Sequence, residues 1–162
     1  MKKYILHILL FISISITSQN VLVDSSTYTA QELIEDVLIN SSCIENLVVT
    51  NVVGGDFGSA EKSFGYFDAN GSSFPLQKGI VLSTGKLSNV GGPNTTLSDD
   101  DATNWGGDSD LENILNEINT LNATIIEFEF SAAANQISFK YLFASEEYQQ
   151  GNSSTCQYSD LF

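Results

Sequence analysis

The sequence predicts a mostly β domain: an antiparallel β-sandwich or jelly-roll-like core with two short peripheral α-helices, incomplete at its C-terminal end. Short segments rich in β-branched and aromatic residues recur between clusters of Gly, Asn, Asp and Ser, which is the pattern of strands joined by turns. Only two segments carry apolar residues at helical spacing. With 42% hydrophobic residues, the chain has enough apolar surface for a packed core.

The N-terminus has the pattern of a secretory signal peptide. Two lysines precede an apolar stretch, residues 4–16, that is too short to span a bilayer and is followed by small residues. We therefore predict a signal peptide over residues 1–19 and one domain over residues 20–162. An N-terminal membrane anchor is the alternative, and the serines within the apolar run disfavour it. The expected location is secreted, extracellular and at the cell surface.

The charge and the histidine content exclude several functions. The formal net charge is -14 and arginine is absent, so the surface repels nucleic acid and anionic lipid. The only histidine, His7, lies in the signal peptide. Hydrolases that use an imidazole base and typical zinc sites are therefore excluded for the rest of the chain.

The first helix is predicted over residues 30–39. Thr29 and Glu32 have the spacing of a capping box, in which each residue bonds the other's backbone N–H. Apolar residues recur at helical spacing behind this cap, and Asn40 with the following serines ends the helix.

Three strands are predicted over residues 44–53, 63–67 and 79–84 because these runs are apolar, β-rich and bounded by turn residues. Residues 68–73, DANGSS, form a turn between the second and third strands. Residues 85–107 have no regular pattern, and so long a loop is usually functional or disordered.

The second helix follows this loop. Asp108 or Ser109 is expected to cap it, with Glu112 completing a capping box. Its apolar residues fall on one face, which we expect to pack on the core: Leu111, Ile114, Leu115 and Ile118.

The strongest β pattern lies near the C-terminus. Residues 124–130 and 136–143 both alternate apolar and polar side chains, and a short loop separates them. We predict a hairpin in which Lys140 lies opposite Glu127 or Glu129.

Two acidic sets are candidate calcium ligands, because carboxylates and carbonyls are the ligands that calcium prefers. The first precedes and opens the second helix, and the second follows the last strand. The seven residues are Asp99, Asp101, Asp108, Asp110, Glu146, Glu147 and Asp160. The alternative is a solvated acidic surface without metal.

The same acids allow a carboxylate-based glycosidase as an alternative. Neighbours on an extended segment point to opposite faces, so Glu146 and Glu147 cannot both flank one glycosidic bond. One of them with Asp160 could. Nothing else in the sequence supports catalysis, so no catalytic residue and no cofactor other than calcium is predicted.

Cys43 and Cys156 are the only cysteines. Export would place them in an oxidising compartment, where they are expected to form a disulfide. Closing so long a loop would stabilise the fold by about 4 to 5 kcal/mol in the chain-entropy model. Two unpaired thiols are the alternative.

Several motifs together resemble the choice-of-anchor L domain of bacterial surface proteins, particularly its Bacteroidetes form. The most specific are FPLQKGIVLSTG, the Gly-Pro-Asn that follows it, and FASEEY. The matching pieces occur in the family's order: residues 28–43, 51–94, 106–114, 139–150 and 156–162.

The resemblance implies an extracellular module. Together with the signal peptide, the lack of a catalytic histidine and the acidic loops, it leads to the hypothesis of a non-catalytic module for adhesion or surface interaction, with an unknown glycan or protein ligand. The resemblance also implies a C-terminal sorting or anchoring region, and the family's pattern continues beyond residue 162, so we expect the chain to be a truncated part of the domain. A lectin-like or carbohydrate-active protein and a structural spacer are the alternatives. Neither nucleic acid nor a membrane span is expected.

Overall fold

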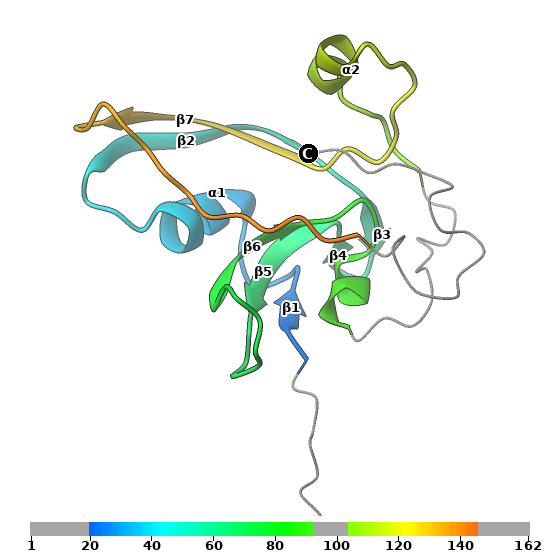
Figure 1. Cartoon of the computed structure of the whole chain (residues 1–162), viewed down its shortest axis with the longest axis horizontal. Helices are drawn as coiled ribbons and strands as arrows, with labels where there is room; N and C mark the ends of the chain where they lie inside the picture. The colour runs from blue at the N-terminus through cyan, green and yellow to red at the C-terminus, as the bar shows by residue number, and fades with distance from the viewer. Residues whose placement is uncertain (1–19, 93–103, 146–162) are drawn as a thin grey trace, which may run out of the picture.

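The computed structural model describes residues 20–92 and 104–145, so the predicted signal peptide lies outside the described residues. The described strands form three antiparallel sheets, one of three strands and two of two strands, with two short helices beside them (Figure 1). This arrangement confirms the mostly β, antiparallel class. No helix within these residues is both long and apolar enough to cross a membrane.

The three-stranded sheet has the order β1-β5-β6, built from β1 (Leu22–Asp24), β5 (Phe64–Asp68) and β6 (Lys78–Leu82). The last two were predicted as strands and are confirmed with small shifts at their ends. The predicted turn between them is also confirmed: Asn70 and Gly71 have φ of 50° and 71°, in the left-handed region that Asn and Gly tolerate best.

The first helix is continuous over the predicted range, as α1 (Ala30–Glu32) followed by a π-helical stretch, η1 (Leu33–Ile39). Its predicted capping box is confirmed: Thr29 Oγ1 accepts from the Glu32 N–H at 3.2 Å, and the Glu32 carboxylate accepts from the Thr29 N–H at 2.7 Å. The helix ends at Asn40, whose φ of 32° turns the chain away. Leu33 and Ile34, 0% and 1% exposed, pack in the core that η1 shares with β5 and β6.

A 3-10 helix, η2 (Leu87–Gly91), packs against β1 of the three-stranded sheet. Its Leu87 is 1% exposed. A Cβ added at Gly65 of β5 would lie 2.6 Å from Leu87 Cδ2, so only glycine at this position allows so close an approach. Gly65 therefore leaves room both for the Asp24 carbonyl of β1 and for the Leu87 side chain of η2.

The two-stranded ribbon pairs β2 (Ile44–Val53) with β7 (Ile125–Ala132). The predicted hairpin between residues 124–130 and 136–143 is therefore wrong. Pairing with β2 continues past the end of β7, because the Ala133 N–H donates to the Cys43 carbonyl at 3.1 Å. Ser131, Ala132 and Ala133, which were expected to lie in the hairpin loop, thus bond to β2 or to the residue before it.

The predicted pairing of Lys140 with Glu127 or Glu129 is not formed, because both glutamates lie opposite residues of β2. Glu127 lies opposite Asn51 and Glu129 lies opposite Val48. Residues 135–145 form no strand, and Figure 1 shows them as an extended trace. Phe139 is 69% exposed.

The outer edge of β2 is covered by one side chain from α1. Gln31 Nε2 donates to the Leu47 carbonyl at 3.0 Å, and its Oε1 accepts from the Val49 N–H at 2.8 Å. These two backbone groups flank Val48, so the amide of Gln31 takes the place of a peptide group from a neighbouring strand. Gln31 Nε2 also contacts Glu35 Oε1 at 2.6 Å.

The remaining sheet, β3 (Asp56–Gly58) with β4 (Glu61–Lys62), connects to the others through Ser63. Ser63 is 0% exposed, and its Oγ accepts from the Gly55 N–H at 2.9 Å. The Ser63 and Thr124 hydroxyls lie 2.8 Å apart, and Thr124 Oγ1 donates to the Ser83 carbonyl at 2.6 Å. The hydroxyl pair of buried Ser63 and half-buried Thr124 thus joins the ends of β6 and β7 to the loop after β2.

Candidate functional site

Most of the predicted calcium ligands lie outside the described residues. These are Asp99, Asp101, Glu146, Glu147 and Asp160. Of the described residues, no group of three or more His, Cys, Asp or Glu side chains is arranged to hold a metal ion. A calcium site that uses the other five acids stays a prediction.

The two described candidates lie at the start of α2 (Ser109–Leu115). Asp108 is the N-cap, and its Oδ1 accepts from the Leu111 N–H at 2.7 Å. Asp110 lies exposed in the first turn. Both positions are favourable for acids because a helix N-terminus carries partial positive charge, so each has a structural role without metal.

The predicted capping box of α2 is not formed. Because Asp108 takes the cap position, Glu112 lies one residue too far along to reach back to it. The Glu112 carboxylate instead accepts from the Thr120 N–H at 2.7 Å and from the Thr120 hydroxyl at 2.9 Å. Glu112 thus fixes the segment that follows the helix.

Cys43 is exposed and forms no disulfide with a described residue. Its predicted partner, Cys156, lies outside the described residues, so the disulfide stays a prediction.

The structure places a pocket between β1 and η2, with a volume of ≈530 Å³. That volume is within the usual range of small-ligand sites. The lining residues come from residues 20–25, from the first residue of β4 and from residues 87–92. They are Asn20, Val21, Leu22, Val23, Ser25, Glu61, Leu87, Ser88, Asn89, Gly91 and Gly92.

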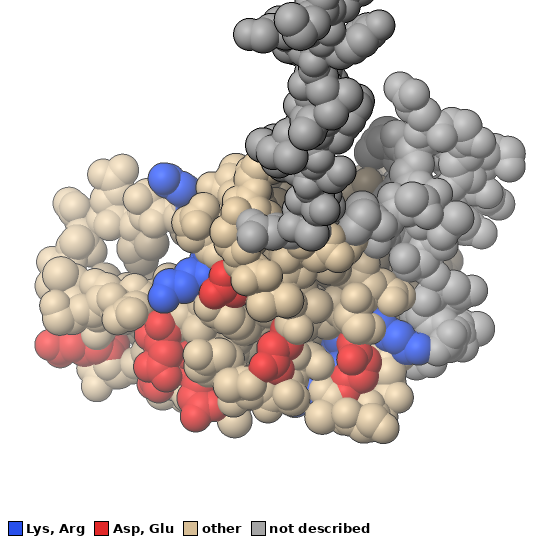
Figure 2. Space-filling model, turned by 90° about the horizontal axis from the view of Figure 1, so that it is seen from below, with Lys and Arg blue, Asp and Glu red and all other residues tan. Residues whose placement is uncertain are grey.

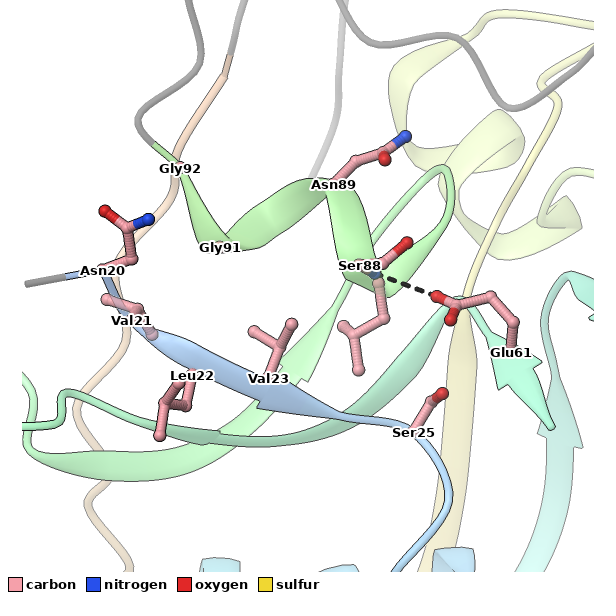
Figure 3. A pocket seen from close by; sticks show the side chains of 11 residues that line it. Asn20, Val21, Leu22, Val23, Ser25, Glu61, Ser88, Asn89, Gly91 and Gly92 are labelled. Carbon is pink, nitrogen blue, oxygen red and sulfur yellow. Dashed lines mark hydrogen bonds between the residues drawn. The ribbon is translucent and has the colours of Figure 1, made fainter.

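The pocket has an apolar middle and polar ends. Figure 3 shows Val23 pointing from β1 toward η2, with Asn20 at one end and Ser25, Ser88 and Glu61 at the other. The Glu61 carboxylate accepts from the Ser88 N–H at 2.9 Å, which fixes Oε1 at the rim. The amide and hydroxyl groups offer hydrogen bonds to a ligand that contacts the apolar middle.

The backbone next to this pocket is fixed by a compact turn. Asp24, the last residue of β1, accepts hydrogen bonds from the N–H and hydroxyl groups of Ser26 and Thr27. These bonds, that from the Thr27 hydroxyl first, lower the pKa of Asp24 from 3.8 to about 2. Ser25, which lines the pocket, is held within this turn and donates to the Ala60 carbonyl at 3.0 Å.

Acidic side chains are prominent on the surface around the described elements. Figure 2 shows them spread along one side of the molecule, with lysines between them. This surface agrees with the net charge of -14.

Sequence reasoning missed the pocket because its walls are far apart in the chain. The signal that was present is the irregular segment after residue 84, which was expected to be functional or disordered. Its first part, residues 87–91, forms η2 and supplies one wall. The pairing of β1 with β5, which supplies the other wall, has no local signal.

Comparison with known proteins gives one match. The family model described as the choice-of-anchor L domain matches residues 22–162. No curated protein and no solved structure matches this chain.

Proposed function

Because this chain belongs to the choice-of-anchor L domain family, we propose that it is a secreted, non-catalytic cell-surface module that binds an extracellular glycan in the pocket between β1 and η2. The family indicates a module associated with the cell surface. Adhesion, secretion and the nature of the ligand are the parts that we propose.

The pocket lining is the observation that carries the proposed ligand class. Sugars present hydroxyl groups around a ring with apolar faces. The pocket offers amide, hydroxyl and carboxylate groups at its ends, Asn20, Ser25 and Glu61 among them, and the side chain of Val23 between them. Its volume of ≈530 Å³ suits a short oligosaccharide rather than a macromolecular surface.

The same lining favours binding over hydrolysis. Of the described residues that line the pocket, Glu61 is the only one with an ionisable side chain. Glycoside hydrolysis ordinarily needs a pair of carboxyl groups on either side of the scissile bond. The Glu61 carboxylate accepts a backbone hydrogen bond, which suits a positioned ligand contact.

Polysaccharide retention by the purified chain tests the proposal. The wild type should be retained on at least one immobilised polysaccharide without releasing reducing sugar. The double variant Asn20→Ala with Glu61→Gln should be retained about tenfold more weakly, because it loses one or two hydrogen bonds to the glycan. Glu117→Gln, which removes the same charge in the segment after α2, is the matched control. Retention that is equal in the pocket variant and the control would contradict the pocket assignment.

Release of reducing sugar would instead support the carbohydrate-active enzyme, whose candidate acids are Glu146 or Glu147 with Asp160. A structural spacer predicts no retention by any polysaccharide. A C-terminal anchoring region stays a prediction.

We also propose that calcium supports the module, on the basis of the aspartate run at residues 99–101. The melting temperature should then rise in millimolar calcium and fall back with chelator. Asp101→Asn should abolish this rise, whereas Asp36→Asn on η1 should not. A melting temperature that does not respond to calcium would refute this part alone.

A further inference from the structure

Residues 104–123 form a closed excursion, which we call the α2 loop. Its two ends are joined by backbone hydrogen bonds: the Asn122 N–H donates to the Trp105 carbonyl at 3.0 Å, and the Ala123 N–H donates to the Gly106 carbonyl at 3.1 Å. Figure 1 shows α2 standing away from the three sheets. The loop is therefore a separate projection with a closed base.

The base is fixed to the rest of the fold through the only tryptophan. Trp105 Nε1 donates to the Ala123 carbonyl at 2.9 Å, and its ring packs edge-on against Phe57 of β3, with centroids 5.9 Å apart. A Cβ at Gly55 would lie 2.6 Å from the Trp105 ring, so the ring fills the space that this glycine leaves. Inside the loop, Asp108 caps the N-terminal end of the helix and Glu112 holds Thr120 in the segment after the helix.

The fixed loop exposes aliphatic side chains. Sequence periodicity predicted that the apolar face of α2 packs on the core, and this prediction is wrong, because no residue of α2 is buried. The exposed fractions are 80% for Ile114, 42% for Leu115, 79% for Ile118 and 62% for Leu121. These four exposed aliphatic residues lie within eight positions of the chain, and groups of exposed apolar residues mark interaction surfaces.

The chain turns repeatedly next to these aliphatic residues. Asn116, Asn119 and Asn122 all have positive φ, of 55°, 62° and 59°. Each directly follows an aliphatic residue, at positions 115, 118 and 121. Asparagine adopts this left-handed conformation more readily than other residues outside glycine, and Asn116 does so as the C-cap of α2. Leu115 and Ile118 thus lie at turns within the loop, and Leu121 lies at its base, where it forms a β-bridge with Gly106.

The charge of the loop selects the kind of partner. All four of its ionisable side chains are acidic, namely Asp108, Asp110, Glu112 and Glu117, and the loop has no lysine or arginine. A second copy of this surface and an anionic membrane would both be repelled. We propose that the α2 loop is a docking surface for a partner protein that presents an apolar patch bordered by Lys or Arg. This surface is separate from the pocket between β1 and η2.

Fluorescence anisotropy with two synthetic amphipathic helical peptides tests whether the purified full chain prefers a basic apolar partner. Both peptides have the same leucine face, and the polar face carries Lys in one peptide and Glu in the other. The Lys peptide should bind, more weakly as salt rises, and Ile114→Ser with Ile118→Ser should weaken it about tenfold or more. Val48→Ser with Val52→Ser, which removes two exposed valines from β2 (54% and 41% exposed), should leave binding unchanged. Equal binding by both peptides, no binding, or equal loss in both variants would overturn the proposal.

A photocrosslinking residue in place of Ile118 tests the same surface on cells that secrete the full chain. The expected product is one discrete crosslink whose partner peptide is apolar with adjacent Lys or Arg. A crosslink to a second copy, to lipid only, or no crosslink would overturn the proposal. Because Ile118 is 79% exposed, its substitution should leave the fold intact, and unchanged Trp105 fluorescence checks this.

Discussion

Ser63→Ala should destabilise the fold far more than its small change in volume suggests. Ser63 is fully buried, and its hydroxyl is the acceptor for the Gly55 N–H at 2.9 Å. Removing the hydroxyl leaves that N–H buried without this acceptor. Thr124 keeps its own hydrogen bond to the Ser83 carbonyl at 2.6 Å, so its loss is smaller.

The expected cost is about 2 kcal/mol, within the range for one buried polar group that loses its partner. For a chain of this size, that cost lowers the melting temperature by about 4 to 8 °C. Urea unfolding followed by the fluorescence of Trp105 gives the free energy of unfolding directly, because Trp105 packs against Phe57 only in the folded chain.

Ser131→Ala is the matched control, because Ser131 is exposed on β7. Its free energy of unfolding should stay within about 0.5 kcal/mol of the wild type. If Ser63→Ala falls within the same margin, the buried hydroxyl network does not join the sheets as described.

Three further predictions concern the helix, the turn after β1 and the base of the α2 loop. Gln31→Glu should lower the free energy of unfolding in urea by about 1 to 2 kcal/mol, because it removes the donor to the Leu47 carbonyl and places a second carboxylate beside Glu35. A smaller loss than that of Gln31→Asn would contradict this prediction. The folded-state pKa of Asp24, about 2, lies below its ordinary value of 3.8, so its stabilisation is present above pH 4 and is lost as the pH falls toward 2. Asp24→Asn should remove this part of the acid dependence in urea midpoints measured from pH 7 to pH 2, and an unchanged slope would refute it. Gly55→Ala should cost about 1 to 3 kcal/mol and shift the Trp105 emission, because the new Cβ would lie 2.6 Å from the ring; an unshifted spectrum would show that the ring does not occupy this space.

The sequence predicted the features that depend on neighbours in the chain. The capping box of Thr29 and Glu32, the helix end at Asn40 and the turn at residues 68–73 each follow from a few adjacent residues, and all are confirmed. Such signals are local because one side chain bonds a backbone group three or four positions away.

Features that depend on residues far apart in the chain could not be predicted from the sequence. Residues 124–130 pair with β2, although residues 136–143 are closer in sequence and carry the same alternation. Alternation tells which face of a strand is apolar, but it does not name the neighbouring strand. For the same reason the pocket between β1 and η2 was not foreseen, and the helical spacing in α2 predicted a buried face that is exposed.

The contact of Gln31 with β2 has a consequence for the order in which the chain folds. Gln31 and Val49 are 18 positions apart, whereas Thr50 of β2 and Glu127 of β7 are 77 apart. Closing the shorter loop costs about 1.3 kcal/mol less chain entropy. We expect α1 and β2 to meet before β7 arrives, with one side of β2 already occupied by an amide. At this position of β2, the incoming strand then has one unoccupied side on which to pair, so Gln31 near the N-terminus favours the side on which β7 adds about a hundred residues later.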